Sequence, residues 1–152
     1  MHKKLINKAN GEFTINNGFI VSNQTTQNAL EQHFGKEKLI QSAYISNCYY
    51  TTSLFEMDNL FFKFYFTIEN DTVKEINFEI ETEHKERIPW ANNRDFETFW
   101  IAWQMNDDTK FNWDNNLDNE QYSIVCIWGS VGIFFDFKQG TYQSYLSYKC
   151  VQ

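Results

Sequence analysis

Residues 73–83 read V-K-E-I-N-F-E-I-E-T-E, and this stretch decides how the fold is interpreted. Side chains alternate between the two faces of a β-strand, so every second residue shares a face. One face then carries Ile76, Phe78, Ile80 and Thr82. The opposite face carries Glu75, Asn77, Glu79, Glu81 and Glu83. Val73 has the parity of the acidic face, and it joins the apolar face only if a β-bulge intervenes.

The row of glutamates, which we call the acidic ladder, consists of Glu75, Glu79, Glu81 and Glu83. Glutamate is depleted in strands, so such a row is unusual. Carboxylates two residues apart on a strand lie about 7 Å apart, close to the phosphate spacing along one nucleic-acid strand. The ladder therefore predicts a contact surface for a partner rich in lysine and arginine. The alternative is a solvated sheet face, or an edge strand kept soluble by charge, with Lys63 and Lys74 neutralising part of it.

The segments before the ladder predict an antiparallel meander. Leu60 to Ile68 alternates clearly, with Leu60, Phe62, Phe64, Phe66 and Ile68 on one face. Asn70-Asp71 predicts the turn into the acidic strand. Tyr44 to Phe55 is rich in aromatic and β-branched residues and predicts a further strand, followed by a turn over residues 56–59. The meander should have one dry face and one wetter face.

The remaining periodic segments predict two helices and four strands. A helix is expected over Gln27 to Phe34, with a cap among residues 22–26 and Gly35 at its end. A second helix is expected from Arg94 to Met105, capped by Asn92 or Asn93, because its aromatic residues recur at helical spacing. The strands are expected over these ranges: Glu12 to Ile15, Tyr122 to Trp128, Val131 to Phe137 and Thr141 to Cys150.

This order of elements predicts an α+β fold in a single domain spanning residues 1–152. We expect an antiparallel sheet, or two sheets, with two helices packed on one face. A helix followed by three strands occurs twice in the predicted order, so two helix-plus-three-strand units are a further option. The sequence leaves open whether the two meanders share one sheet, and it leaves the oligomeric state open.

Composition restricts the partners. The net charge of −7 and the pI near 4.9 argue against binding to nucleic acid or to an anionic membrane. A core can be filled by the 15 Phe, 8 Tyr and 5 Trp.

No segment approaches the roughly 20 apolar residues of a membrane span, and the basic start has no apolar stretch behind it. The three cysteines include no C-x-x-C pair, so we expect a reduced, cytoplasmic location.

Asn106 to Glu120 is an acidic, asparagine-rich loop, and we predict that it forms a second contact patch. Its candidate residues are Asp107, Asp108, Asp114 and Asp118. A calcium loop of the EF-hand type starting at Asp114 needs Gly at position 6 and Glu at position 12, where Asn119 and Val125 stand. An unstructured connector is the other interpretation. We expect no metal and no cofactor.

No catalytic set is visible. The chain has no H-E-x-x-H, G-x-S-x-G or P-loop motif, and His2, His33 and His84 are scattered. Cys126 lies in an apolar run and is expected to be a buried structural thiol. The chain is therefore expected not to be an enzyme.

Tyrosine parity predicts exposed aromatic residues. Tyr142 and Tyr145 have opposite parity, and Tyr49 and Tyr50 are adjacent, so each pair sends one ring away from the core. Exposed tyrosines beside carboxylates suit protein binding. The alternative is aromatic cover on the second sheet face.

The C-terminal part carries the motifs D-F-E-T-F-W-I-A-W at 95–103, N-W at 112–113 and W-G-S-V-G-I-F-F-D-F-K-Q-G-T-Y-Q-S-Y-L-S-Y at 128–148. In these motifs, its size and its charge, the chain resembles the small acidic immunity proteins of bacterial polymorphic-toxin systems, such as those of contact-dependent inhibition and type VI secretion. The resemblance implies a protein that binds a cognate toxin domain and blocks its active site. Acidic steering favours a basic nuclease as that toxin. The alternative function is a small-ligand or adaptor-binding module with an aromatic-lined cavity beneath the helices.

Overall fold

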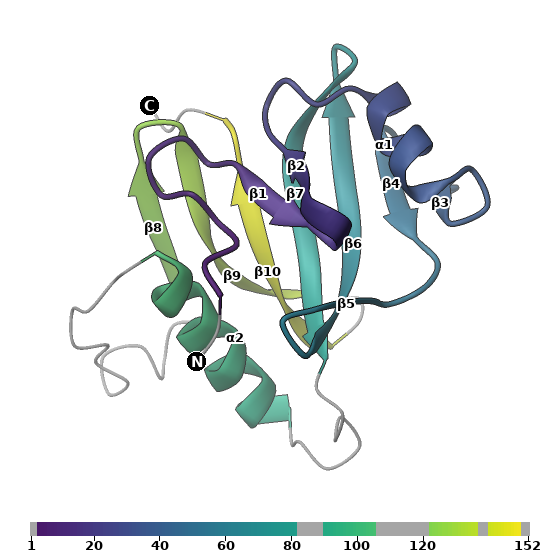
Figure 1. Ribbon diagram of the computed structural model, residues 1–152. Helices are drawn as coiled ribbons and strands as arrows, with labels where there is room; N and C mark the ends of the chain where they lie inside the picture. The colour runs from purple at the N-terminus through teal and green to yellow at the C-terminus, as the bar shows by residue number, and fades with distance from the viewer. Residues whose placement is uncertain (1–2, 82–89, 106–121, 137–139, 150–152) are drawn as a thin grey trace.

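The structure is a computed structural model that describes residues 3–81, 90–105, 122–136 and 140–149 (Figure 1). Its main element is one antiparallel sheet of eight strands in the order β3-β4-β6-β7-β10-β9-β8, with β5 paired to β6; β1 and β2 form a separate hairpin. The elements, apart from a short 3-10 turn at Asn16–Gly18, are β1 (Phe13–Ile15), β2 (Phe19–Val21), α1 (Gln27–Phe34), β3 (Leu39–Gln41), β4 (Cys48–Thr51), β5 (Phe55–Met57), β6 (Leu60–Glu69), β7 (Thr72–Glu81), α2 (Trp90–Gln104), β8 (Tyr122–Cys126), β9 (Gly129–Asp136) and β10 (Thr141–Ser147). The predicted α+β class is confirmed.

The β6–β7 hairpin is the longest pairing in the sheet, and it follows the predicted strands closely. Asn70 and Asp71 both have positive φ, at 53° and 68°, as the tight turn of a two-residue hairpin requires. The pairing shifts register between Thr67 and Ile68, which face Glu75 and Val73, so Lys74 is an extra residue on β7. This bulge explains the parity of Val73, which is fully buried with the apolar face.

The acidic strand lies in the interior of the sheet. β7 pairs with β6 on one side and with β10 on the other, through Phe78 with Ser144 and Ile76 with Leu146. The interpretation as a charged edge strand is therefore wrong. The same β7–β10 pairing joins the two meanders into one continuous sheet, which answers the question of one sheet or two.

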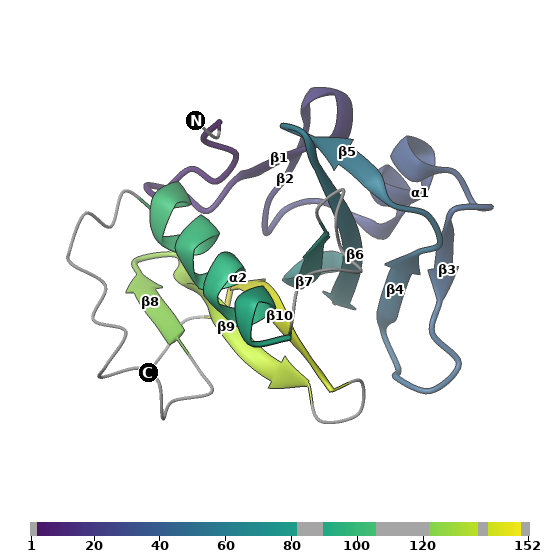
Figure 2. The same cartoon turned by 90° about the horizontal axis from the view of Figure 1, so that it is seen from below.

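One face of the sheet carries an aromatic core. Phe62, Phe64, Phe66 and Phe78 are fully buried there. The ring of Phe13 from β1 lies 5.2 Å from that of Phe78, the Phe34 ring at the end of α1 lies 5.8 Å from that of Phe66, and the Trp100 ring of α2 lies 5.7 Å from that of Phe78. These edge-on and tilted contacts are favourable geometries for aromatic pairs. Figure 2 shows α2 beside β9 and β10, and the β1–β2 hairpin between α2 and α1.

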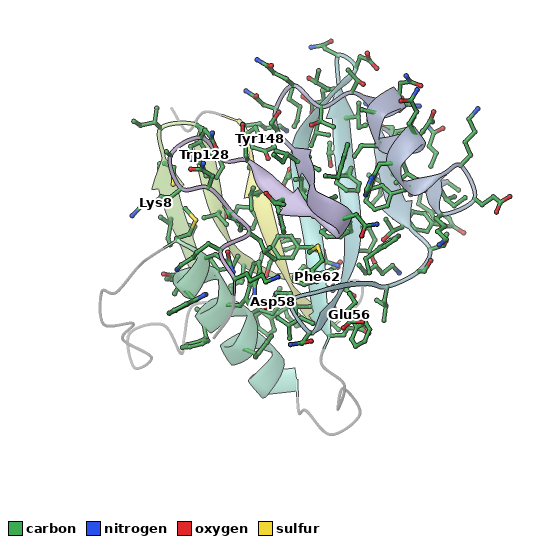
Figure 3. All side chains as sticks on the ribbon, in the orientation of Figure 1. Lys8, Glu56, Asp58, Phe62, Trp128 and Tyr148 are labelled. Carbon is green, nitrogen blue, oxygen red and sulfur yellow. The ribbon has the colours of Figure 1, made fainter. Side chains whose placement is uncertain are left out.

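The N-terminal segment is fixed by side chains from distant elements. Gln104 at the end of α2 accepts a hydrogen bond from Leu5 N at 2.6 Å, and its Nε2 donates to Lys3 O at 2.6 Å. Trp128 donates from Nε1 to Lys8 O at 2.8 Å, and the Tyr148 hydroxyl donates to Gly11 O at 2.8 Å (Figure 3). A Cβ on Gly11 would lie 2.5 Å from the Trp128 ring, so this close approach needs glycine.

Several short elements differ from the prediction. The strand expected over Tyr44 to Phe55 is reduced to β4, and the short strands β2 and β3 were not predicted. The turn expected over residues 56–59 is too long, because β5 extends to Met57 and only Asp58 and Asn59 turn the chain, both with positive φ. Residues 42–47 turn instead, because the Ser42 hydroxyl accepts hydrogen bonds from the amides of Tyr44 and Ile45 and because Asn47 has a φ of 62°. Helix α2 begins at Trp90, so Asn92 and Asn93 lie inside it and do not cap it. Helix α1 has the predicted bounds, with Thr26 as its N-cap.

Candidate protein-binding face

Beyond the bulge, alternation along β7 places Glu75, Asn77, Glu79 and Glu81 on the face opposite the aromatic core, where all four are half-buried. The described part of the acidic ladder thus lies on one sheet face. The other candidate residues, Glu83, Asp107, Asp108, Asp114 and Asp118, lie outside the described residues.

Neighbouring strands bring tyrosines to the same face. The register pairs Tyr50 with Tyr65, Tyr65 with Asn77, and Asn77 with Tyr145, so one row crosses β4, β6, β7 and β10. As parity predicts, Tyr145 and Tyr50 point away from the core, whereas Tyr142 and Tyr148 are buried in it. We call this surface the ladder face and define it by Tyr50, Lys63, Tyr65, Glu75, Asn77, Glu79, Glu81, Asp136, Gln143 and Tyr145.

Lys63 lies directly across from Glu79 on the ladder face. Its Nζ is 5.3 Å from the centre of the Tyr65 ring and 5.9 Å from that of the Tyr50 ring, within the range of cation–π attraction. Burial lowers the pKa of Lys63, but contacts with Tyr65, Glu79 and Tyr50 outweigh burial and raise it overall. The face therefore holds a cation between aromatic rings and a carboxylate.

Gln143 connects two carboxylates of the ladder face. Its Nε2 donates to Glu79 Oε1 at 2.9 Å and lies 3.5 Å from Asp136 Oδ2 at the end of β9. Gln143 itself is buried, although β10 places it on this face. The amide therefore fixes the position of the Glu79 carboxylate on the ladder face.

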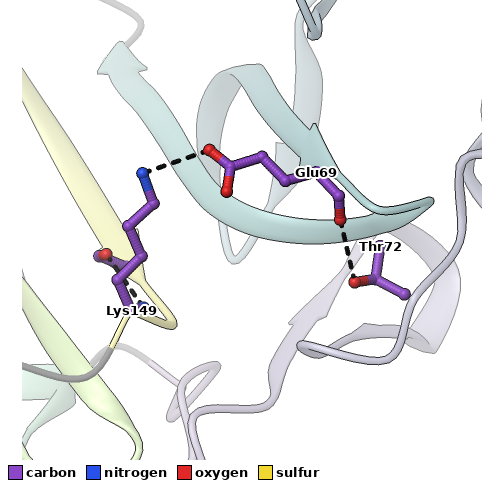
Figure 4. Close-up of polar contacts among 4 residues, drawn as sticks. Glu69, Thr72 and Lys149 are labelled. Atoms are coloured by element: carbon purple, nitrogen blue, oxygen red, sulfur yellow. Dashed lines mark hydrogen bonds and ion pairs between the residues drawn. The ribbon is translucent and has the colours of Figure 1, made fainter.

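Glu75 lies at the other end of the described ladder, near an exposed ion pair. Lys149 Nζ is 3.4 Å from Glu69 Oε1, and Thr72 donates to the Glu69 carbonyl oxygen (Figure 4). Burial raises the pKa of Glu75, Lys149 opposes the rise, and Glu69 adds to it. A half-buried carboxylate with a raised pKa is poorly solvated, so a further cation beside it would stabilise its charged form.

Tyr145 is held across β9. Its hydroxyl hydrogen-bonds with the side chains of Ser123 and Ser130, and it faces Gly132 in the register. A Cβ on Gly132 would lie 1.9 Å from Tyr122 O, so only glycine allows β8 to approach here. Burial raises the pKa of Tyr145, which stays a neutral hydrogen-bonding group.

Glu97 of α2 is a second unusual carboxyl, on the core side of the sheet. It is fully buried, and its Oε1 accepts a hydrogen bond from Ile80 N at 2.9 Å. The Ser144 hydroxyl donates to its Oε2. Burial raises the pKa of Glu97 to about 8, against the effect of these two hydrogen bonds and with a smaller contribution from Glu79. Glu97 meets β7 where the β7–β10 pairing ends, next to Phe78.

Several residues of the ladder face were not predicted from the sequence. Asp136 and Gln143 join it only because β10 pairs with β7, and no periodic pattern reveals strand partners. Tyr65 had the correct parity in the predicted strand, so this signal was present. Cys126, predicted to be buried, is only half-buried on β8, where it packs against the core; burial raises its pKa and Lys8 opposes the rise.

Among the described residues, no group of three or more His, Cys, Asp or Glu side chains could hold a metal ion. In the same part of the chain, no helix is long and apolar enough to cross a membrane. Comparison with protein families, with characterised proteins and with solved structures finds no match. The resemblance to immunity proteins therefore stays a prediction.

Proposed function

We propose that this chain is a non-catalytic, cytoplasmic immunity protein that binds a cognate bacterial toxin domain, a basic nuclease, through the ladder face and blocks its active site. The observation that carries the proposal is that Glu75, Glu79 and Glu81 share one sheet face with Tyr50, Tyr65 and Tyr145. Tyrosine is enriched at the centres of protein interfaces, and carboxylates steer a basic partner toward its docking site.

The proposal includes the finer arrangement of the fold. In it both helices cover the core side of the sheet, and the last strands of the two groups that follow them, β7 and β10, meet at the centre. Helix α1 is followed by β3 to β7 and α2 by β8 to β10, so the predicted option of two helix-plus-three-strand units is wrong for the first group. The ladder face is then the side left for a partner. Ring contacts from Phe34 and Trp100 to β6 and β7 support this arrangement.

The burial of Ser144 and Glu97, a pair that resembles a catalytic serine and its base, supports a non-catalytic role. Ser144 and Glu97 are hydrogen-bonded, but both side chains are fully buried in the core. A substrate has no route to either atom without unfolding of the packed helix. Binding therefore fits the described chemistry better than turnover does.

The second candidate function is a ligand-binding module. A cleft of about 520 Å³ lies at the β6–β7 turn, lined by Gln27, Asn47, Tyr49, Ile68, Glu69, Asn70 and Asp71. This lining is mostly polar, whereas the predicted cavity was aromatic and beneath the helices. Because the described rings pack against one another in that core, the cleft favours a ligand site less than the ladder face favours a protein partner.

The test is co-expression with the toxin domain encoded by the neighbouring gene, followed by measurement of affinity at low and high salt. Glu79→Lys with Glu81→Lys should weaken binding on the order of tenfold or more and reduce its salt dependence. The matched control is Glu31→Lys with Glu37→Lys, which makes the same charge change around α1. Unchanged affinity of the ladder variant at low salt would remove the ladder face from the interface, and the absence of any complex would overturn the proposed function.

A further inference from the structure

The polar cleft at the β6–β7 turn is built from three segments that lie far apart in the sequence. Gln27 contributes from the start of α1, Asn47 and Tyr49 contribute from the start of β4, and residues 68–71 contribute from the β6–β7 hairpin. Its volume of about 520 Å³ lies within the range of small-molecule sites, about 300–1,000 Å³. The cleft is therefore large enough for a small ligand.

Backbone hydrogen bonds hold the walls of the cleft in place. Ile68 N donates to Asn47 O at 2.8 Å, which joins the segment before β4 to β6. Val73 N donates to Thr25 O at 2.9 Å, and an isolated bridge pairs Thr26 with Thr72, so the start of α1 is joined to β7. The cleft is thus formed without a ligand, as most small-molecule sites are.

Solvent-exposed amides and one aromatic ring line the cleft. Asn47, Asn70 and Asp71 are exposed, and within the described part of the chain their side chains form no hydrogen bond. The Gln27 amide donates one hydrogen bond, to Glu31 Oε1 at 3.1 Å, which leaves its oxygen and a second N–H available. The half-buried Tyr49 provides an aromatic surface. A ligand from solvent can therefore reach both donors and acceptors.

The charge of the cleft restricts the ligand further. Glu69 lies 3.4 Å from Lys149 Nζ, so its charge is already balanced (Figure 4). Asp71 is then the one uncompensated charge among the described lining residues, and none of these is a cation. An anion would be repelled by Asp71, and a single carboxylate is too little for a metal ion. An apolar ligand would remove water from the amides without replacing its hydrogen bonds.

We propose that this cleft binds a neutral hexose sugar, at a site separate from the ladder face, and this inference does not rest on the proposed function. Each sugar hydroxyl both donates and accepts, as do the amides of Asn47 and Asn70, and the Asp71 carboxylate can accept from two neighbouring hydroxyls. The negatively polarised face of the Tyr49 ring attracts the C–H groups on one face of a pyranose. A polyamine has donors but no acceptors when charged, so it would leave the amide N–H groups unmatched.

The test titrates glucose, galactose and mannose separately into the full chain and follows the titration by NMR. At least one of these sugars should shift the side-chain amides of Asn47 and Asn70 and the ring of Tyr49. The uronic acid of the same sugar, which differs by one carboxylate, should bind about fivefold or more weakly because Asp71 repels it. Putrescine should also bind more weakly than the sugar.

Three variants connect binding to the lining residues. Asn47→Gly removes an amide at a φ of 62°, which glycine adopts freely, and should weaken sugar binding about fivefold. Asp71→Asn keeps a residue that tolerates the φ of 68°, and it should reduce the difference in affinity between sugar and uronic acid. Asn17→Gly makes the same change as the first variant at a φ of 60° in the β1–β2 turn, and it should leave binding unchanged.

The inference is overturned if none of the three sugars shifts the residues of the cleft, or if the uronic acid or putrescine binds as tightly as the sugar. It is equally wrong if Asn47→Gly binds the sugar as the wild type does. A toxin complex without any sugar binding would leave the proposed function standing and remove the sugar site. Sugar binding at the cleft without a toxin complex would do the reverse.

Discussion

At the scale of single residues, Glu97 shows how burial turns a carboxyl into a neutral hydrogen-bonding group. The folded protein holds its proton up to about pH 8, whereas an unfolded glutamate releases it near its ordinary pKa of 4.5. Between these values the folded state binds more protons than the unfolded state. The stabilising contribution of Glu97 to the free energy of unfolding is therefore fully present below about pH 4.5, and it is lost as the pH rises through about 8.

We predict that Glu97→Gln removes this loss. The glutamine stays neutral, and its carbonyl can still accept from Ile80 N. Relative to wild type, the variant should gain stability as pH rises from about 5 to about 9, on the order of a few kcal/mol, because a pKa shift is a stability difference. Urea unfolding across this range measures the gain. The control is Glu56→Gln, which changes an exposed carboxyl and should follow the wild-type dependence of stability on pH. If the Glu97→Gln curve instead runs parallel to the wild-type curve, Glu97 is already ionised in the folded protein and the prediction is wrong.

At the scale of elements, the bulge at Lys74 sets which side chains of β7 face the core. Deleting Lys74 would join Val73 to Glu75 in regular alternation and keep the pairs of Ile68 with Val73 and Thr67 with Glu75. The cost is the hydrogen bond from Tyr148 N to Lys74 O. The deletion should therefore fold, with a loss of about 1–2 kcal/mol read from its melting temperature.

Deletion of Asn77 is the matched control, since it puts Ile76 and Phe78 out of phase and should abolish folding. Equal tolerance of the two deletions, or equal damage from them, would contradict the role assigned to the bulge. Near-UV circular dichroism separates a packed core from a collapsed chain in both variants.

Elements with strong local patterns were predictable, and elements set by distant contacts were not. β6, β7 and α1 follow from alternation, from the Asn70-Asp71 turn, and from Thr26 and Gly35 as caps. The three-residue strands β2 and β3 are too short for a period to be recognised, and they exist because β1 and β4 pair with them. The glutamates of the candidate site were predictable from parity, but Asp136 and the tyrosine row depend on strand order.

At the scale of the whole molecule, the two faces of the sheet differ in the side chains that they carry. The core side gathers rings from β1, α1, α2, β6 and β7. Replacing one of these large side chains with a small one therefore leaves a cavity. The ladder face carries mostly half-buried polar and aromatic residues, with Gln143 buried among them. Along β6 and β7, successive residues alternate between the two faces, and the extra residue Lys74 shifts this alternation by one position in β7.

A survey of alanine variants over residues 60–81, read for abundance and for toxin binding, should therefore divide by parity. Phe62→Ala, Phe64→Ala and Ile76→Ala should lose about 2–5 kcal/mol of stability and reduce abundance. Tyr65→Ala and Glu79→Ala should stay within about 1 kcal/mol of wild type and reduce binding. The phase should reverse in β7 at the bulge, so that Val73 behaves as a core residue despite its odd number. If variants of the ladder face lose abundance as strongly as those of the core, that face is packed against other parts of the chain and cannot be the contact surface.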